Sequence, residues 1–240
     1  MEIGPNIRRL GKGLVNSYLV QTGGEVTIVD AGAPSYWGEL PRELAAMGRS
    51  LDDVRAVVLT HGHSDHIGFA ERIRRERNTP VHVHELDAAL ARGEVPNPSK
   101  GLGPVKLAPL LEFLVFSATH GLLRIPRIQE VSTYGDGATL DLPGSPRVIL
   151  VPGHTPGSAA LHFPAHDALF IGDAIATHSV TTGVDGPRIA PFTADPAQAL
   201  ASLARLDGLE ARLVLPGHGQ AWTQGVAAAL AEARAAAASG

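Results

Sequence analysis

The chain has 240 residues, no cysteine and a formal net charge of −4, with 20 basic and 24 acidic side chains. The lack of cysteine excludes disulfides and thiolate chemistry. The acidic balance argues against an enzyme that holds nucleic acid through its phosphates, and no run of about 20 apolar residues exists that could span a membrane. The first residues carry no basic region followed by an apolar one, so we expect no export signal and predict a cytoplasmic protein.

Segments typical of strands and helices alternate along the chain. Strands are predicted at residues 26–30, 54–60, 81–84, 147–150, 169–172 and 213–215. Helices are predicted at about 36–47 and 65–77. This alternation predicts an α/β fold, and the length suits a substantial core. No long linker rich in serine or glycine interrupts the chain, so we expect a single domain over residues 1–240.

The most informative segment runs from Thr60 to His66, directly after an apolar strand. It carries three imidazoles and one carboxylate, at His61, His63, Asp65 and His66. These side chains suit zinc, iron or manganese. The first two histidines, two residues apart, can point the same way, whereas the other pair follows where a helix is expected to begin. Two pairs from two directions predict two adjacent metal positions; an exposed polar loop is the alternative.

Residues from about 94 to 127 break the alternation and form a predicted insertion. After several prolines and glycines, apolar residues recur at the spacing of a helix with one apolar face: Leu107, Leu110, Leu111, Leu114 and Val115, widened by Phe113 and Phe116. Glu112 is almost the only charge in this helix. Three interpretations remain: a packed helix, a lid over the metals, or the surface of a homodimer. The position after the first ligand cluster favours the last two, and an apolar lid favours a substrate with an apolar portion.

Three later residues complete a candidate metal site: His154, Asp173 and His218. Each follows an apolar strand and a turn signal, which is the placement of a functional group on a loop held by a rigid sheet. The repetition of this design at four places argues against a coincidental polar loop. His178 follows Asp173 by five residues and is a further candidate to enter the cleft.

In these motifs the chain resembles the metallo-β-lactamase superfamily of metal-dependent hydrolases, from about residue 7 to residue 219. An HxHxDH motif followed in order by a lone His, a lone Asp and a late Gly-His is specific to that superfamily. The resemblance implies a four-layer αβ/βα sandwich with the site at one edge of two facing sheets. It also implies a shared ligand set: His61, His63 and His154 on a first metal, Asp65, His66 and His218 on a second, and Asp173 bridging both.

Differences between this chain and individual branches of the superfamily narrow the choice of branch. The lack of cysteine and the bridging Asp173 argue against true β-lactamases, and His63 stands where flavodiiron proteins carry Glu. Acyl-homoserine lactonases share the seven ligands but place Tyr where this chain has Ala176. Glyoxalase II enzymes also share them, but their C-terminal region carries basic residues for glutathione, whereas this one is Ala-rich with a single Arg234. The chain therefore resembles the branch of lactonases and glyoxalase II in its ligands, but it lacks the further residues typical of each enzyme.

The predicted function is hydrolysis of an ester, lactone or thioester carbonyl by a hydroxide that bridges two divalent metal ions. Zn²⁺ is expected, with Fe and Mn as alternatives. Asp65 or a metal-bound water is the candidate to bring a proton to the leaving group, and His178 is a third, less favoured candidate. The expected partner is a small-molecule substrate, not nucleic acid or a membrane.

Two other functions compete with this one. The first is a mononuclear iron oxidoreductase of the persulfide dioxygenase type, which would leave Asp65, His66 and His218 without an obvious role. The second is a non-catalytic metal-binding protein, which the complete ligand set disfavours.

Overall fold

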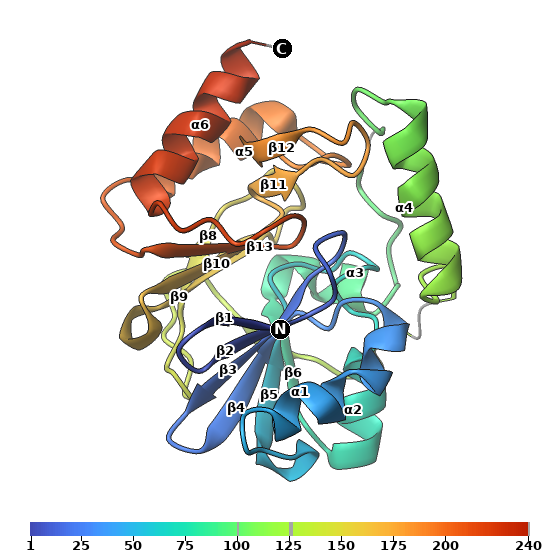
Figure 1. The fold of residues 1–240 in the computed structure, drawn as a ribbon, viewed down its shortest axis with the longest axis vertical. Coiled ribbons are helices and arrows are strands. Elements are labelled where there is room, and N and C mark those ends of the chain that lie inside the picture. The colour runs from blue at the N-terminus through green and yellow to red at the C-terminus, as the bar shows by residue number, and fades with distance from the viewer. Residues whose placement is uncertain (100, 125–126, 240) are drawn as a thin grey trace.

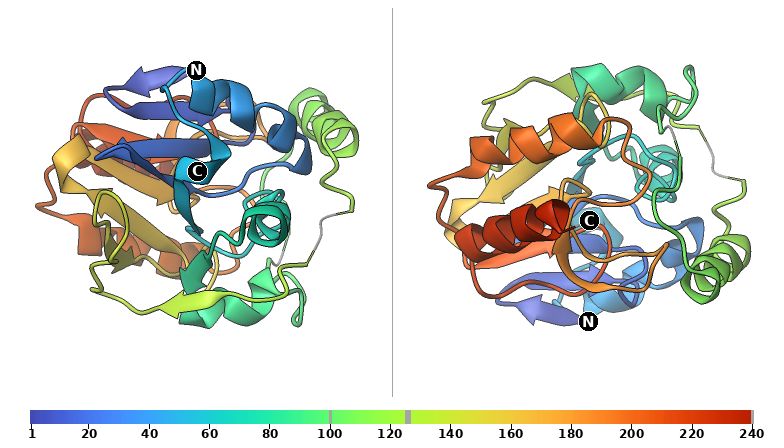
Figure 2. Two further views of the ribbon diagram at one scale, coloured as in Figure 1. Left: turned by 90° about the horizontal axis from the view of Figure 1, so that it is seen from below. Right: turned by 90° about the horizontal axis from the view of Figure 1, so that it is seen from above.

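Two mixed β-sheets face each other in the computed structural model, and helices cover their outer faces (Figures 1 and 2). The structure describes residues 1–99, 101–124 and 127–239. Among these residues no helix combines the length and the apolar character needed to cross a membrane.

The larger sheet contains seven strands in sequence order. They are β1 (Glu2–Gly4), β2 (Ile7–Leu10), β3 (Ser17–Thr22), β4 (Glu25–Val29), β5 (Val54–Val58), β6 (Val81–His84) and β7 (Ser132–Tyr134). Strands β1 to β4 pair antiparallel, and β4 to β7 pair parallel. Parallel neighbours need crossover connections. The connections here contain the helices α1 (Leu40–Ala45), α2 (Ala70–Arg77), α3 (Ala88–Ala91) and α4 (Leu107–Thr119).

The smaller sheet has four strands in the order β13-β10-β9-β8. They are β8 (Arg147–Leu150), β9 (Ala159–Phe163), β10 (Ala168–Gly172) and β13 (Leu213–Pro216), with β10 and β13 parallel. A separate hairpin joins β11 (Ala176–His178) to β12 (Asp185–Arg188). Helices α5 (Pro196–Ser202) and α6 (Val226–Ala238) follow it in the chain.

Alternation of side chains along the strands explains why the molecule has four layers. Successive residues of a strand point to opposite faces, so Ile28 of β4 faces the helices while Val29 faces the second sheet. Between the sheets, Phe163 and Phe170 pack edge to face with ring centroids 5.1 Å apart. The αβ/βα sandwich implied by the resemblance is therefore confirmed.

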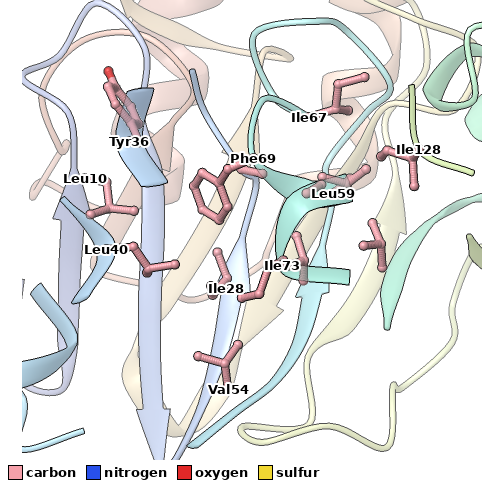
Figure 3. Close-up of a cluster of buried hydrophobic side chains, with 14 of the residues drawn as sticks. Leu10, Ile28, Tyr36, Leu40, Val54, Leu59, Ile67, Phe69, Ile73 and Ile128 are labelled. Atoms are coloured by element: carbon pink, nitrogen blue, oxygen red, sulfur yellow. The ribbon is translucent and has the colours of Figure 1, made fainter. Parts of the chain in front are cut away.

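Two outer cores attach the helices to the sheets. Leu40 of α1 and Ile73 of α2 pack on the larger sheet beside Phe69 (Figure 3). On the other side, Val226 and Leu230 of α6 pack on the smaller sheet. Burial of each large apolar side chain stabilises the fold by roughly 1.5–3 kcal/mol, so these outer cores and the core between the sheets hold the strand ends in fixed positions.

The helix predicted at residues 65–77 begins five residues later than expected, at Ala70. The backbone before it pairs with the loop after β4 instead: the Ala31 N–H donates to the His66 carbonyl at 2.6 Å, and the Gly68 N–H donates to the Gly32 carbonyl at 2.9 Å. A Cβ at Gly68 would lie 2.1 Å from that carbonyl oxygen, so only glycine fits. The ligand motif is consequently on a tethered loop rather than on a helix.

Other boundaries also differ from the expectation. The helix predicted at 36–47 is divided into a 3₁₀ turn, Pro34–Gly38, and α1. Pro41 lacks an N–H and suits the first turn of a helix, which explains a new start there. The predicted strands 26–30 and 54–60 end earlier, at Val29 and Val58.

The helix in the predicted insertion is present as α4, but the face that packs differs from the prediction. Phe113 and Phe116 lie against the core, whereas Leu107 and Leu111 are 81% and 57% exposed. The two aromatic rings bury more area than the leucines would, and they lie on the opposite side of the helix. The leucine stripe identified from the sequence therefore faces outward. A lid-like insertion at 94–127 within one domain stays a prediction, and residues 100, 125 and 126 lie outside the described part.

We predict that Phe113→Ser lowers the free energy of unfolding by about 1–2 kcal/mol, because a half-buried ring is lost. Leu111→Ser, on the exposed side of the same helix, should change it by less than about 0.5 kcal/mol. Denaturant unfolding of both variants checks this ranking. A larger loss for Leu111→Ser would contradict the assigned orientation of α4.

Candidate metal centre

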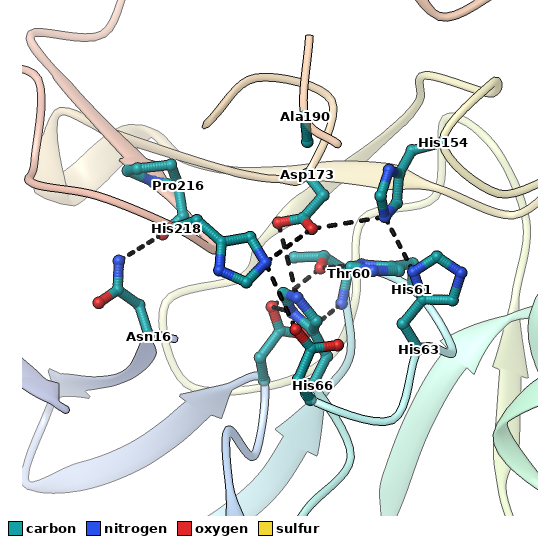
Figure 4. Close-up of polar contacts among 12 residues, drawn as sticks. Asn16, Thr60, His61, His63, His66, His154, Asp173, Ala190, Pro216 and His218 are labelled. Carbon is teal, nitrogen blue, oxygen red and sulfur yellow. Dashed lines mark hydrogen bonds and ion pairs between the residues drawn. The ribbon is translucent and has the colours of Figure 1, made fainter. Parts of the chain in front are cut away.

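Five strands end at one edge of the sandwich, and each is followed by a residue of the site. The strands β4, β5, β8, β10 and β13 precede Asp30, the His61–His66 loop, His154, Asp173 and His218 respectively. The carboxyl-terminal ends of these strands, which come from both sheets, thus lie close together at this edge (Figure 4). This convergence brings together candidate ligands that are up to 157 positions apart in sequence, from His61 to His218.

The seven predicted ligands lie together at this edge. Their ligand atoms form three groups in which all members lie within 4.8 Å of one another: His61, His63 and His154; His61, His66 and Asp173; and Asp65, His66 and His218. The first and third groups are the two trios implied by the resemblance, and the middle group joins Asp173 to both sides. All are buried except Asp65, whose side chain is 16% exposed.

Hydrogen bonds fix the imidazoles of the first trio. The Thr60 hydroxyl donates to Asp30 at 2.9 Å and so accepts from Nδ1 of His61 at 3.0 Å. The Thr193 hydroxyl donates to the Ala190 carbonyl at 2.7 Å and accepts from Nδ1 of His154 at 3.0 Å. In both histidines Nδ1 therefore carries the hydrogen, and Nε2 presents a lone pair to the site.

The third member, His63, uses its other nitrogen. Its Nδ1 lies 2.9 Å from Nε2 of His154. Because His154 Nε2 is an acceptor there, a proton must lie between the two nitrogens when no cation is bound. A divalent cation held at this site would instead accept a lone pair from each of the two nitrogens.

The second trio is held by carboxylates and by a backbone carbonyl. Nδ1 of His66 lies 2.8 Å from Oδ2 of Asp30, and Nδ1 of His218 donates to the Leu14 carbonyl. Nε2 of His218 faces Asp173 Oδ2 at 3.0 Å and Asp65 Oδ2 at 3.4 Å. A carboxylate or carbonyl that accepts from the other ring nitrogen of a ligating histidine orients the imidazole and raises its basicity.

Asp173 lies between the two trios. Its Oδ2 is 3.0 Å from Nε2 of His218 and 3.4 Å from Nε2 of His154, and its Oδ1 is 3.5 Å from Nε2 of His66. A Cβ at Gly217 would lie 2.2 Å from Oδ1. The glycine before His218 is therefore required to leave room for this carboxylate.

The two trios differ in their protonation when no metal is bound. Burial, reinforced by the neighbouring imidazoles, holds the pKa values of His61 and His154 well below the usual value. Burial also opposes the charge on His218, but the nearby Asp173 and Asp65 carboxylates outweigh it and raise its pKa to about 9. Likewise, carboxylates led by Asp173 overcome burial and raise the pKa of His66 well above the usual value.

The donors fit metal ions. Several buried polar atoms that face the site have no hydrogen-bond partner among the described residues: Nε2 of His61, Nε2 of His66 and Oδ1 of Asp173. An unpaired buried polar group costs roughly 1–3 kcal/mol, and divalent cations at the site would satisfy all three. Neutral imidazoles on one side and a carboxylate-rich trio on the other suit two adjacent cations.

Two carboxylates that support the site were not identified from the sequence. Asp30 binds Thr60 and His66, as described above. Asp87, fully buried, accepts from Gly62 N–H at 2.8 Å, from Gly157 N–H at 2.7 Å and from the Thr155 hydroxyl at 2.7 Å. It thereby ties the loop of His61 and His63 to the loop of His154. An aspartate directly after an apolar strand, as in Val29-Asp30, was the available sequence signal for Asp30; nothing local marks Asp87.

His178 is not brought into the cluster. It lies on β11 at the edge of the hairpin, and its Nδ1 is 2.7 Å from the exposed carboxylate of Asp185. Its predicted catalytic role stays a prediction, and Asp65 is the better placed of the two candidate residues because it belongs to the third group of ligand atoms.

Comparisons with known proteins agree with this geometry. Residues 10–218 match the family described as the metallo-beta-lactamase superfamily, so the chain belongs to that superfamily. Within it, the chain is an enzyme of the metallo-hydrolase type. It is similar to the probable metallo-hydrolase YflN of Bacillus subtilis, at 30% identity over 86% of this chain and 81% of that protein.

Two solved structures are also similar to this chain. A metallo-beta-lactamase family protein from Thermus thermophilus, TTHA1429, matches with a TM-score of 0.70 and 25% identity, over 98% of this chain and 80% of that one. TTHA1623, solved in a di-iron-bound form, matches with a TM-score of 0.62 and 29% identity, over 90% of this chain and 93% of that one.

We predict that Asp30→Asn weakens metal binding about 10–100-fold, the usual effect of losing a group that orients a ligating histidine. The carboxylate accepts through both oxygens, Oδ1 from the Thr60 N–H and Oδ2 from the Thr60 hydroxyl and from His66, whereas an amide has a single oxygen. The control is Asp141→Asn, which changes the same atoms at an exposed position. Titration against a competing chelator measures the affinity; equal affinity in both variants would contradict a supporting role for Asp30.

We also predict that Asp173→Ala abolishes activity and weakens metal binding more than His82→Ala does. Asp173 is the carboxylate that faces both trios, whereas His82 lies on β6, outside the three ligand groups. Metal content after dialysis against a chelator ranks the two. Similar metal loss from both variants would count against a bridging position.

Proposed function

We propose that this metallo-hydrolase cleaves an ester, lactone or thioester at a centre of two divalent metal ions. The observation that carries the proposal is the joining of two ligand trios by one carboxylate, with Asp173 within 3.5 Å of histidines from both sides. Two divalent ions, when bound, lower the pKa of a shared water toward neutrality and polarise a carbonyl.

The residues around the centre have distinct roles in this proposal. Hydrogen bonds through Thr60 and Thr193 keep His61 and His154 in the tautomer that ligates through Nε2. Phe113 excludes water from one side, since its ring centroid lies 6.3 Å from that of His218. A less hydrated site strengthens the electrostatic stabilisation of an oxyanion.

We propose that the Asp65 carboxylate takes up the proton released by the attacking water and passes it to the leaving group. Unlike the other ligands, it is partly exposed, and it lies on the same side as His218. Ala176, buried on β11, offers no hydroxyl where lactonases place a tyrosine. The Asp65 carboxyl, once it carries that proton, is therefore the acid that this chain supplies at the site.

Zn²⁺ is the proposed metal, with iron and manganese as alternatives, because imidazole and carboxylate suit all three. The di-iron form of the relative TTHA1623 keeps iron in consideration for this chain. A mononuclear iron oxidoreductase is the weaker alternative, since the trio of Asp65, His66 and His218 is assembled and supported as fully as the first. Metal analysis of protein purified without added metal separates them: two ions per chain, or one iron.

Three further proposals concern the whole molecule. The exposed stripe of α4, which includes Leu107, Leu111, Leu114 and Val115, is proposed as the surface of a homodimer. Sedimentation of wild type and Leu111→Ser tests this, with a shift toward monomer expected in the variant. A cytoplasmic location and a single domain remain proposals from the sequence.

We predict that the metal-loaded protein hydrolyses chromogenic esters, lactones or thioesters more efficiently than penicillins or carbapenems. The bridging aspartate and the apolar surroundings are the reasons. Values of kcat/KM over a panel of these substrates provide the test. Efficient β-lactam turnover would contradict the substrate class, and full activity after metal removal would contradict the mechanism.

A further inference from the structure

A cavity of about 610 Å³ adjoins the candidate metal centre. Its walls come from the loop before α4, the β11–β12 hairpin, the segment that follows β12, and the end of α6. The hairpin lies between α6 and α4 (Figure 1), and the Lys106 N–H donates to the Thr181 carbonyl at 2.8 Å. The cavity volume lies within the range of about 300–1,000 Å³ typical of sites for small organic molecules.

One end of the cavity meets the metal ligands. Thr193 lines the cavity and bonds to His154. Ala190, also in the lining, accepts a hydrogen bond from the Thr193 hydroxyl through its carbonyl. A group bound in the cavity would therefore be separated from the candidate ligand His154 by the Thr193 side chain alone.

An aromatic pair marks the boundary between the cavity and the metal centre. The ring of Phe192 lies 6.0 Å from the ring of Phe113, which in turn faces His218. Phe192 has a φ of 61°, a conformation that costs a bulky residue roughly 1–3 kcal/mol and persists only where its surroundings impose it. The surroundings of Phe192 therefore hold an aromatic ring at the inner end of the cavity.

The charged residues in the lining all have one sign. Most of the walls are apolar or small, and Lys106 and Arg188 are the charged side chains among the described lining residues. The Arg188 guanidinium donates to the Gly186 carbonyl at 3.1 Å and to the Asp185 carbonyl at 2.7 Å. Among the residues that the structure describes, no carboxylate forms an ion pair with this guanidinium. Its charge is therefore available to a ligand.

Arg188 lies toward the outer end of the cavity. A Cβ placed at Gly186 would be 3.9 Å from the Arg188 side chain and 3.8 Å from Glu232 of α6. The same helix contributes Ala236 and Ala237 to the wall. The cation is thus beside α6, whereas Thr193 and Ala190 are at the metal end.

We propose that this cavity binds the acyl part of the substrate, an apolar chain or ring that ends in an anionic group recognised by Arg188. This proposal rests on the proposed hydrolase function, because the metal centre is what would receive the carbonyl. The apolar walls favour the chain, and an arginine favours a carboxylate through charge-assisted hydrogen bonds. The proposed hydrolase function by itself requires neither an apolar chain nor an anionic group in the substrate.

Binding of acids that resemble the hydrolysis product tests the proposal without requiring turnover. Calorimetry on the metal-loaded protein would compare octanoic acid with octanedioic acid, which carries a second carboxylate at the far end. We expect octanedioic acid to bind roughly tenfold more tightly, the effect of one charge-assisted contact. Arg188→Gln should remove that difference and leave octanoic acid unaffected. The control is Arg212→Gln, an exposed arginine outside the cavity.

A second pair of variants tests the location. Ala236→Trp fills the outer end of the cavity and should weaken binding of both acids at least tenfold, whereas Ala235→Trp, on the same helix but outside the lining, should not. Equal affinities for the two acids in wild type, or unchanged binding in Ala236→Trp, would overturn the proposal.

Hydrolysis of the panel of chromogenic esters, lactones and thioesters by wild type distinguishes failure of the cavity proposal from failure of the hydrolase proposal. If the acids bind as expected and no ester, lactone or thioester of the panel is cleaved, the cavity assignment stands and the hydrolase proposal fails. If esters are cleaved while the acids show no preference and no sensitivity to Ala236→Trp, the hydrolase proposal stands and the cavity assignment fails.

Discussion

The site depends on a single buried carboxylate, Asp173, which is 4% exposed and faces imidazoles from both trios. An isolated ionised carboxylate in such an interior is very costly unless it is paired. Without metal, protonated His218 and His66 supply the compensating charge; burial opposes ionisation of Asp173, but these two cations hold its pKa well below the usual value. Metal binding would replace those protons by divalent charge, so the folded chain is already arranged for cations.

The sandwich is what makes this pairing possible. Ligands on loops after β5, β8, β10 and β13 can meet only because the carboxyl ends of both sheets lie at one edge. The two sheets are also connected directly there: the Ala159 N–H donates to the Thr60 carbonyl at 2.9 Å. Asp87 links two of the ligand loops in the same way. The geometry of the site is therefore a property of the whole core rather than of any one loop.

The sequence predicted the layers and the ligands well, because both leave local patterns. An apolar strand followed by a turn and a histidine is visible without a structure, as at His154 and His218. Features that depend on distant partners were not predictable. The loop of His66 pairs with Ala31 rather than starting a helix, α4 packs through its phenylalanines rather than its leucines, and Asp87 acts across the fold. Periodicity identifies an apolar face but not which neighbour covers it.

The central claim is that two metal ions lie on either side of Asp173. Anomalous diffraction from a crystal of the metal-loaded protein, recorded at the absorption edge of the bound metal, tests it most directly. We predict two peaks about 3.5–4 Å apart, one among His61, His63 and His154, and the other among Asp65, His66 and His218. A single peak in the first trio at saturating metal, with Asp65 and His218 turned away, would contradict it.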